Sequence, residues 1–396
     1  MSAWQEARRI LCVRLDSLGD VLMCTPAMRA LRAAVPGRTL TLLTAPAGAA
    51  AAPFIPEVDE VIAHRAAWMK HDARAAADAP SNAAGHDGGQ DGGHDSRHDS
   101  GLALVDLLAA RAFDGAVIFT TYTQSALPAA LLCQLAGIPL RLAHCRENPY
   151  ALLSDWVPDP EPAGMVRHEV QRQLALVRRI GCPPAGMALS QRLSFVPRAR
   201  DVAAARALLR QAGVDADAPW LLLHPGASAA SRRYPPAQWA AVLRLLAQRP
   251  GLPLVLTGSV AEAPLVDDIR RAAGVPAVSL AGRLGLGELG AALALAAVAV
   301  ANNTGPAHMA AAVGTPLVDL YALTNPQHTP WAVPNRVLFH DVPCRFCYKS
   351  TCQAGHHACL AGVAPERVAD AVATLLRGAA GRPRPGGIRI APQATA

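Results

Sequence analysis

A short polar loop within residues 301–316, ANNTGPAHMAAAVGTP, carries the residue types that a ligand site needs. Asn303, Thr304 and Gly305 follow directly after an apolar run. Pro306 suits the first turn of a helix, and that helix would carry His308. At such a helix start, backbone N–H groups face an anion such as a diphosphate, while a hydroxyl and an imidazole add directed hydrogen bonds. From this loop alone, an ordinary turn with Asn and Thr as helix caps stays equally open.

A second group of chemically active residues is a run of cysteines near the end of the chain. With two adjacent histidines, it comprises Cys344, Cys347, Cys352, Cys359, His356 and His357. Thiolates and imidazoles this close in sequence could enclose one structural zinc or iron ion, although the spacing is not that of a standard zinc finger. Free thiols or disulfides are the alternatives, and a catalytic metal is not expected.

Alternating strands and helices must position these residues. In the first half, strands are expected at 10–15, 39–43, 58–62 and 115–119, and helices up to about 35 and at 102–112 and 126–136. In the second half, strands are expected at 220–223, 254–256 and within 293–300, and helices at 203–212, 236–248, 262–273 and 365–377. The alternation breaks around 183–197. This pattern predicts an α/β protein of two Rossmann-like domains, 1–195 and 196–378, with a loose tail at 379–396.

The composition agrees with this fold class and limits the kinds of partner that are expected. The chain has 396 residues, of which 52% are hydrophobic and only 4% aromatic, which suits helices packed on parallel strands. The net charge of +7 is moderate, and several arginines lie in the tail. No nucleic-acid partner is therefore expected, whereas a nucleotide sugar or a phosphorylated lipid at a membrane surface is compatible with the charge.

The expected location is the cytoplasm. The first apolar run, residues 10–13, is interrupted by Arg14 and Asp16, so no secretory signal is expected. The longest apolar run, around 289–301, is shorter than the roughly 20 residues of a membrane span. Peripheral contact with the cytoplasmic face of the inner membrane is an option. The nine cysteines should not form lasting disulfides in a reducing compartment.

Residues 71–101 lose all periodicity and become rich in His, Asp and Gly. This composition predicts a disordered surface insertion in the first domain. His86, His94 and His98 could bind a metal, but nothing in their spacing defines a coordination geometry.

Four segments in order resemble glycosyltransferase family 9, the bacterial heptosyltransferases that build the lipopolysaccharide core. They are VRLDSLGDVLMCTPAMRAL, LLLHPGASAASRRYPPAQW, LTGSVAE and NNTGPAHMAAAVGTP, between residues 13 and 316, and a similar Cys-rich tail occurs in some relatives. The resemblance implies a GT-B fold, in which two Rossmann-like domains face each other across a cleft and the second holds most of the donor. It further implies inverting transfer from a nucleotide sugar, usually ADP-heptose, with no metal or other cofactor required.

In the first domain the resemblance places the general base on Asp20. An acceptor hydroxyl must lose its proton as it attacks the anomeric carbon, and a carboxylate facing the cleft can take it. By the same resemblance, Arg14, Ser17 and Gly19 lie on the acceptor side. The spacing of Ser17 and Asp20 also fits a helix capping box, so capping is the alternative role for Asp20.

In the second domain the resemblance assigns the donor contacts. Arg232 matches the basic residue that neutralises the diphosphate as it departs, and Arg233 could substitute for it. Glu262 matches the acidic residue that holds the ribose; its alternative role is to balance the dipole of the following helix. The other matching donor positions are Gly226, Ser228, Gly258, Thr304, Gly305 and His308.

One donor position departs from the family pattern. The family usually has an Asp before the Thr-Gly pair of the loop, whereas this chain has Asn303, which can form hydrogen bonds but carries no charge. The leading hypothesis is an inverting glycosyltransferase that moves heptose or a related sugar to a lipopolysaccharide core or other glycan. The alternatives are a catalytically silent GT-B module that binds a nucleotide sugar, and a GT-B sugar-nucleotide epimerase.

Overall fold

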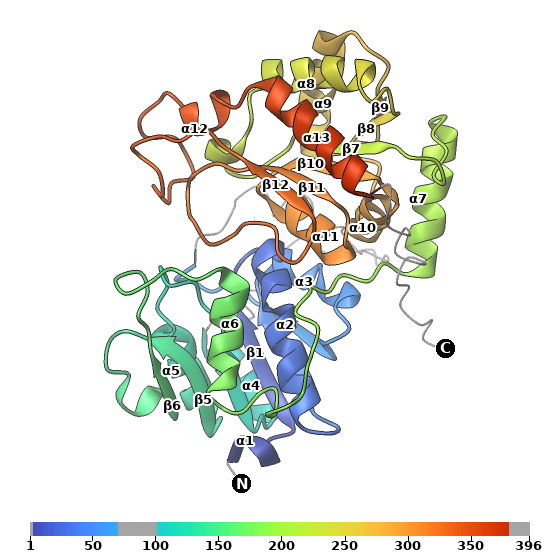
Figure 1. The fold of residues 1–396 in the computed structure, drawn as a ribbon. Helices are drawn as coiled ribbons and strands as arrows, with labels where there is room; N and C mark the ends of the chain where they lie inside the picture. The colour runs from blue at the N-terminus through green and yellow to red at the C-terminus, as the bar shows by residue number, and fades with distance from the viewer. Residues whose placement is uncertain (1–2, 70–100, 380–396) are drawn as a thin grey trace, which may run out of the picture.

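The first of two parallel sheets collects strands from the amino-terminal part of the chain (Figure 1). The computed structural model describes residues 3–69 and 101–379. In this sheet the strand order is β3-β2-β1-β4-β5-β6, and every neighbouring pair is parallel. The strands are β1 (Arg9–Arg14), β2 (Thr39–Thr44), β3 (Glu60–Ala63), β4 (Gly115–Ile118), β5 (Leu140–Cys145) and β6 (Asp155–Pro158).

The second sheet repeats the same architecture with later strands. Its order is β12-β11-β10-β7-β8-β9, again with parallel pairs throughout. Counted within each sheet, both follow the order 3-2-1-4-5-6 that is typical of doubly wound nucleotide-binding folds. The strands are β7 (Leu221–His224), β8 (Leu254–Leu256), β9 (Val278–Ser279), β10 (Val298–Asn302), β11 (Leu317–Leu320) and β12 (Asn335–Leu338).

The central strands explain the apolar runs in the sequence. Only Arg9 of β1 is exposed, and β10 is buried throughout. A parallel sheet covered by helices on both faces needs apolar side chains on both faces, so the runs are nearly continuous. The strand order reverses between β1 and β4 and between β7 and β10. Ligands of open α/β sheets bind at the carboxyl ends of strands beside such a reversal.

Two helices bring the carboxyl ends of the two sheets together (Figure 1). Helix α2 (Leu18–Ala34) packs on α6 (Glu169–Arg178), and α11 (Gly305–Val313) packs on α2. At the crossing, a Cβ atom on Gly19 would lie 2.5 Å from His308 Cδ2. A glycine is therefore needed at residue 19 for α2 and α11 to approach this closely.

The other helices cover the sheets, and the chain passes from the first layer to the second between α6 and α7. They are α1 (Ala3–Glu6), α3 (Pro46–Ala49), α4 (Gly101–Ala110), α5 (Leu127–Leu135), α7 (Ala199–Gln211), α8 (Pro236–Gln248), α9 (Ala263–Ala273), α10 (Leu286–Leu295), α12 (Ala358–Ala361) and α13 (Pro365–Ala379). Across residues 3–69 and 101–379, none of the helices has the length and apolarity to cross a bilayer. Most of the predicted insertion, with His86, His94 and His98, and the tail from residue 380 lie outside the described residues.

Candidate functional site

Two adjoining cavities open at the carboxyl ends of the central strands. Their volumes are about 200 Å³ and about 1070 Å³. The residues that line both cavities mark their junction: Asp16, Ser17, Asp20, Thr123, Gln124, Arg232 and Tyr348. Apart from Tyr348, these residues follow β1, β4 or β7, so the junction lies at the reversal points of both sheets.

Arg14, the last residue of β1, is the electrostatic centre of the first domain's side. Its guanidinium is fully buried, with Nε 2.7 Å from Asp16 Oδ2 and Nη2 3.2 Å from Asp20 Oδ1. Nη1 lies 2.6 Å from Glu169 Oε1. One cation thus holds three carboxylates, which could not be buried as charged groups without it.

Asp20, in the first turn of α2, has protein partners on both carboxylate oxygens. Oδ2 accepts hydrogen bonds from Ser17 Oγ at 2.6 Å and from the Ser17 N–H at 3.3 Å, the contacts of a capping box. Oδ1 faces Arg14 and lies 3.9 Å from His328 Nε2. Burial disfavours the charge, but Arg14, His328 and Ser17 together hold the pKa of Asp20 below its ordinary value. Asp20 is therefore a firmly ionised carboxylate and a weak proton acceptor.

Asp16 lies within the segment VRLDSLGDVLMCTPAMRAL, but it was not among the predicted site residues. Its Oδ1 accepts a hydrogen bond from Gln124 Nε2 at 2.6 Å. Burial raises the pKa of Asp16 to about 6; the charge of Arg14 opposes this shift, and the charges of Asp20 and Glu169 add to it. Asp16 thus binds a proton more readily than an ordinary aspartate. Its place two residues after a strand end was the signal available in the sequence.

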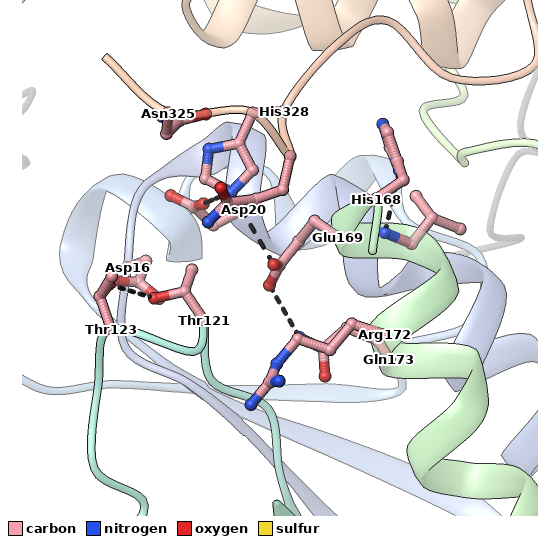
Figure 2. Close-up of polar contacts among 12 residues, drawn as sticks. Asp16, Asp20, Thr121, Thr123, His168, Glu169, Arg172, Gln173, Asn325 and His328 are labelled. Atoms are coloured by element: carbon pink, nitrogen blue, oxygen red, sulfur yellow. Dashed lines mark hydrogen bonds and ion pairs between the residues drawn. The ribbon is translucent and has the colours of Figure 1, made fainter. Parts of the chain in front are cut away.

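Glu169 and His328 complete this cluster from segments far apart in the chain. Glu169, the first residue of α6, is fully buried, and its Oε1 accepts a second hydrogen bond from Gln173 Nε2 at 2.7 Å. His328, from the loop between β11 and β12, lies between Asp20 and Glu169, with Nε2 3.9 Å from a carboxylate oxygen of each (Figure 2). Burial opposes ionisation of Glu169, yet Arg14 and His328 hold its pKa far below the usual range.

His308 and its helix start face the smaller cavity. Burial, with the charges of neighbouring side chains, lowers the pKa of His308 to about 3, so the imidazole is neutral and suited to hydrogen bonding. Thr304 and Gly305 line the same cavity as His308, Gly19 and Asp20. The loop singled out from the sequence therefore meets the loop after β1.

Arg232 lies on the second domain's side of the junction. Its guanidinium makes no hydrogen bond or ion pair with any residue that the structure describes. By contrast, Arg233 Nε donates to the Ala227 carbonyl at 2.8 Å. Both arginines and the exposed Ser228 line the larger cavity. An unpaired arginine near a helix start is an arrangement that can bind a diphosphate.

Glu262, which was expected to hold the ribose, forms a separate group with two of the predicted donor glycines, Gly226 and Gly258. Glu262 Oε2 accepts a hydrogen bond from the Ser259 N–H at 2.8 Å and lies 3.8 Å from His224 Nε2. A Cβ atom on Gly226 would overlap the Glu262 carboxylate, and one on Gly258 would lie 3.2 Å from Glu262 Cβ. The three predicted residues thus come together, but none of them lines either of the two cavities.

Asn303 is buried and contacts protein groups rather than either cavity. Its Nδ2 donates to Asp319 Oδ2 at 3.1 Å and to the His328 carbonyl at 2.8 Å. Burial raises the pKa of Asp319 to about 7, against the effect of the Asn303 hydrogen bond. The family's carboxyl is absent at residue 303, but a carboxyl stands next to it at residue 319, and the amide between them anchors the loop of His328.

The cysteine-rich segment borders the larger cavity, which Tyr348, Ser350 and Thr351 line. Two of its cysteines are exposed and two are partly buried: Cys344, Cys347, Cys352 and Cys359. The Cys344 thiol lies 3.7 Å from His356 Nε2, and the Cys352 thiol accepts the His357 N–H at 3.4 Å. These donors suit zinc or iron in kind, but in the described parts of the chain no three His, Cys, Asp or Glu side chains gather to hold an ion. The predicted structural metal therefore stays a prediction.

Comparison with known proteins identifies related families and folds. The sequence profile of glycosyltransferase family 9 (heptosyltransferase) matches residues 102–358. None of the curated proteins matches the chain. Among solved structures, a family 9 glycosyltransferase from Veillonella parvula DSM 2008 is 20% identical, with a TM-score of 0.73 over 94% of this chain and 98% of that one.

Two further structures come from E. coli. ADP-heptose lps heptosyltransferase II is 22% identical, with a TM-score of 0.67 over 94% of this chain and all of the other (100%). Heptosyltransferase WaaC with ADP is 17% identical, with a TM-score of 0.58 over 94% and 98% of the two chains. At these identities the similarity shows the fold, and it confirms the GT-B architecture predicted from the sequence.

Proposed function

Because the chain belongs to glycosyltransferase family 9, we propose that it is an inverting transferase that moves a heptose, or a related sugar, from a nucleotide sugar to a glycan. ADP-heptose is the proposed donor, since one similar enzyme is named for it and another was solved with ADP. A lipopolysaccharide core or other glycan is the proposed acceptor. The proposed chemistry uses no metal or other cofactor.

The observation that supports this proposal most strongly is that groups of opposite charge face each other across the cavity junction. Asp16 and Asp20 on one side are carboxylates, while Arg232 on the other is a cation that has no ion pair among the described residues and lies beside the start of α11. Sugar transfer needs both, because a hydroxyl must lose a proton while a diphosphate gains negative charge as it departs.

In the proposed step the acceptor oxygen bonds to the anomeric carbon on the face opposite the diphosphate. A carboxylate at the end of β1 takes the hydroxyl proton as the bond between the anomeric carbon and the phosphate oxygen breaks. Arg232 and the N–H groups at the start of α11 stabilise the departing nucleoside diphosphate. Asp20, the base implied by the resemblance, and Asp16 are the two carboxylates available at this place.

The larger cavity suits the acceptor. Trp68, which is 40% exposed, and Met69 give one part of its wall an apolar surface on which a sugar ring can stack. Arg65 adds a cation on the same side. The smaller cavity, with Thr304 and His308, is left for the sugar of the donor.

Calorimetry and a transfer assay test the proposal. The folded protein should bind ADP-heptose more tightly than the uridine or guanine nucleotide sugars, and incubation with core oligosaccharides should add one heptose of inverted anomeric configuration. If no nucleoside diphosphate or nucleotide sugar binds, the donor site is wrongly assigned. A preference for a uridine compound would remove only ADP-heptose from the proposal.

A further inference from the structure

We infer that the cysteine-rich segment, residues 344–359, positions Arg232 for the donor diphosphate, and that it does so by holding the adjacent Ser231. The inference rests on the proposed transferase function and adds a residue to its donor site. Arg232 is the residue that would touch the diphosphate, whereas Ser231 is a positioning residue that acts through its neighbour. Figure 1 shows the segment between β12 and α12.

Ser231 is a buried residue in an otherwise accessible loop. Residues 225–235 connect β7 to α8, and within 228–233 only Ser231 is buried, with 4% of its surface exposed. A serine has little apolar surface to bury, and its polar groups lose their contacts with water when they are covered. Burial at this place therefore requires hydrogen-bond partners from another part of the chain.

The cysteine-rich segment supplies these partners. The Ser231 N–H donates to the Ser350 carbonyl at 3.0 Å, and Ser231 Oγ donates to the Lys349 carbonyl at 2.7 Å. His357 Nε2 donates in turn to the Ser231 carbonyl at 2.7 Å. That carbonyl belongs to the peptide group that Ser231 shares with Arg232. The segment thus holds the backbone on which the Arg232 side chain stands.

Among the described residues, the other hydrogen bonds of residues 227–233 stay within the loop. The Arg232 N–H donates to the Ala229 carbonyl at 3.0 Å, and Arg233 Nε donates to the Ala227 carbonyl at 2.8 Å. Bonds within a loop shape it but do not place it relative to the rest of the protein. The contacts of Ser231 therefore determine where the backbone of Arg232 lies at the cavity junction.

The position of this backbone matters because an arginine binds phosphate oxygens through a planar fork of N–H groups, which must point at them. The Arg232 side chain has no partner among the described residues that would hold it before the donor arrives. Its preorganisation therefore depends on its backbone. None of the three contacts of Ser231 uses a thiol, so this role is separate from metal binding by the cysteines.

A double-mutant cycle on nucleotide binding tests whether Ser231 acts through Arg232. Calorimetry measures the Kd of ADP, or of whichever nucleoside diphosphate the parental protein binds most tightly, for Ser231→Ala, Arg232→Ala and the double variant. Ser231→Ala should weaken binding by about threefold to tenfold, which corresponds to the loss of one hydrogen bond. In the Arg232→Ala background the same change should alter the Kd by less than about twofold, because the residue that Ser231 positions is gone.

Thr315→Val is the matched control. Thr315 Oγ1 is a buried hydroxyl that donates to the Leu293 carbonyl at 2.6 Å, beyond the carboxyl end of α11. Its loss should lower the melting temperature but leave the Kd of the nucleotide unchanged. A change in Kd that appears with Ser231→Ala and not with Thr315→Val therefore reports on the donor site and not on general stability.

The inference is overturned if Ser231→Ala binds the nucleotide as tightly as the parental protein, since Ser231 would then have a structural role alone. It is also overturned if Ser231→Ala weakens binding equally in both backgrounds, because Ser231 would then act without Arg232. If the parental protein binds no nucleoside diphosphate, the donor site of the proposed function fails, and this inference fails with it. Detectable binding with either of the first two results overturns the inference alone.

Discussion

The loops after β1 and β10 occupy equivalent places in two sheets of the same strand order, yet their charges are arranged in opposite ways. After β1, the buried Arg14 is surrounded by three carboxylates within the protein. After β10, Thr304 directly precedes α11, and the nearby Arg232 has no partner among the described residues. On the first side the cation is fully paired within the protein, and on the second side the cation is left open to an incoming anion. We call the loop after β1, with Arg14 and its carboxylates, the first wall, and the loop after β10, with Arg232, the second wall. The same topology thus supplies a proton-accepting wall and a diphosphate-binding wall, and the difference lies in which charges are paired within the protein.

The largest expected effect comes from removing the cation of the first wall. Arg14→Met leaves three carboxylates without their shared partner, so the free energy of unfolding should fall by about 3–5 kcal/mol. The loss should shrink as the pH is lowered, because protonation relieves the uncompensated charges. Denaturant titrations at several pH values measure this, with Arg271→Met, at a largely exposed position, as the control. A small, pH-independent change would show that Arg14 does not hold the cluster together.

The next effect concerns the contact that holds the two walls together. Gly19→Ala places a methyl group 2.5 Å from His308 Cδ2, and such overpacking should cost about 1–3 kcal/mol. In a His308→Ala background, where the clash is absent, Gly19→Ala should lower the melting temperature much less. Gly378→Ala, where the new atom meets nothing within 4 Å, is the control. If Gly19→Ala melts like the parental protein, the close approach of α2 and α11 is incorrect.

A smaller effect is expected on the side of the second wall. Asn303→Asp removes the donor that serves Asp319 and the His328 carbonyl, which should cost on the order of 1–3 kcal/mol at pH 8. Since the folded-state pKa of Asp319 is raised to about 7, folding binds protons, and its stabilising effect is lost as the pH rises from about 4 through 7. The second carboxyl should steepen that loss.

Thermal melts at pH 5 and pH 8 test this pair. Asn148→Asp is a matched control because Asn148 uses only its oxygen, which accepts the Tyr150 N–H, and Asp keeps that oxygen. If Asn303→Asp is as stable as the parental protein at pH 8, the hydrogen bond from Asn303 to Asp319 does not contribute to stability.

The smallest effect on transfer is expected from removing an ion from the cysteine-rich segment. Protein purified without chelator should contain about one zinc or iron ion per chain, because four thiols and two imidazoles in one segment suit such an ion. Removing the ion should lower the melting temperature but leave kcat nearly unchanged, since no step of the proposed reaction uses a metal. Elemental analysis and melting curves measure both, and a metal-free protein of unchanged stability would leave the cysteines as ordinary thiols.

The fold was predictable because the central strands are apolar on both faces and end in abrupt polar loops. The family and the GT-B architecture predicted from these segments are confirmed. The strands that were not predicted are β5, β6, β9, β11 and β12. Two of them have weak signals, since β6 reads DWVP and contains a proline, and β9 has only two residues. Edge strands are buried less evenly than central ones, so hydrophobic patterns predict them poorly.

The candidate site was predictable only in part. Asp20, Thr304 and His308 follow strand ends within recognisable motifs, and the structure brings them to one cavity. Glu169 resembles an ordinary acid in a first helical turn, and His328 lies in a loop without a motif, so only packing shows that they meet. Likewise, no pattern shows that the Asn303 side chain turns toward Asp319.

The donor affinity of variants at two neighbouring arginines, Arg232 and Arg233, tests most directly whether the second wall binds the diphosphate. Calorimetric titration of ADP-heptose should show that Arg232→Ala weakens binding about tenfold to a hundredfold, because its guanidinium is free to meet the diphosphate. Arg233→Ala should bind within about threefold of the parental protein, since Arg233 is already bonded to the Ala227 carbonyl. If Arg232→Ala binds the donor as tightly as the parental protein while folded, the second wall is not the diphosphate site, and the central claim fails.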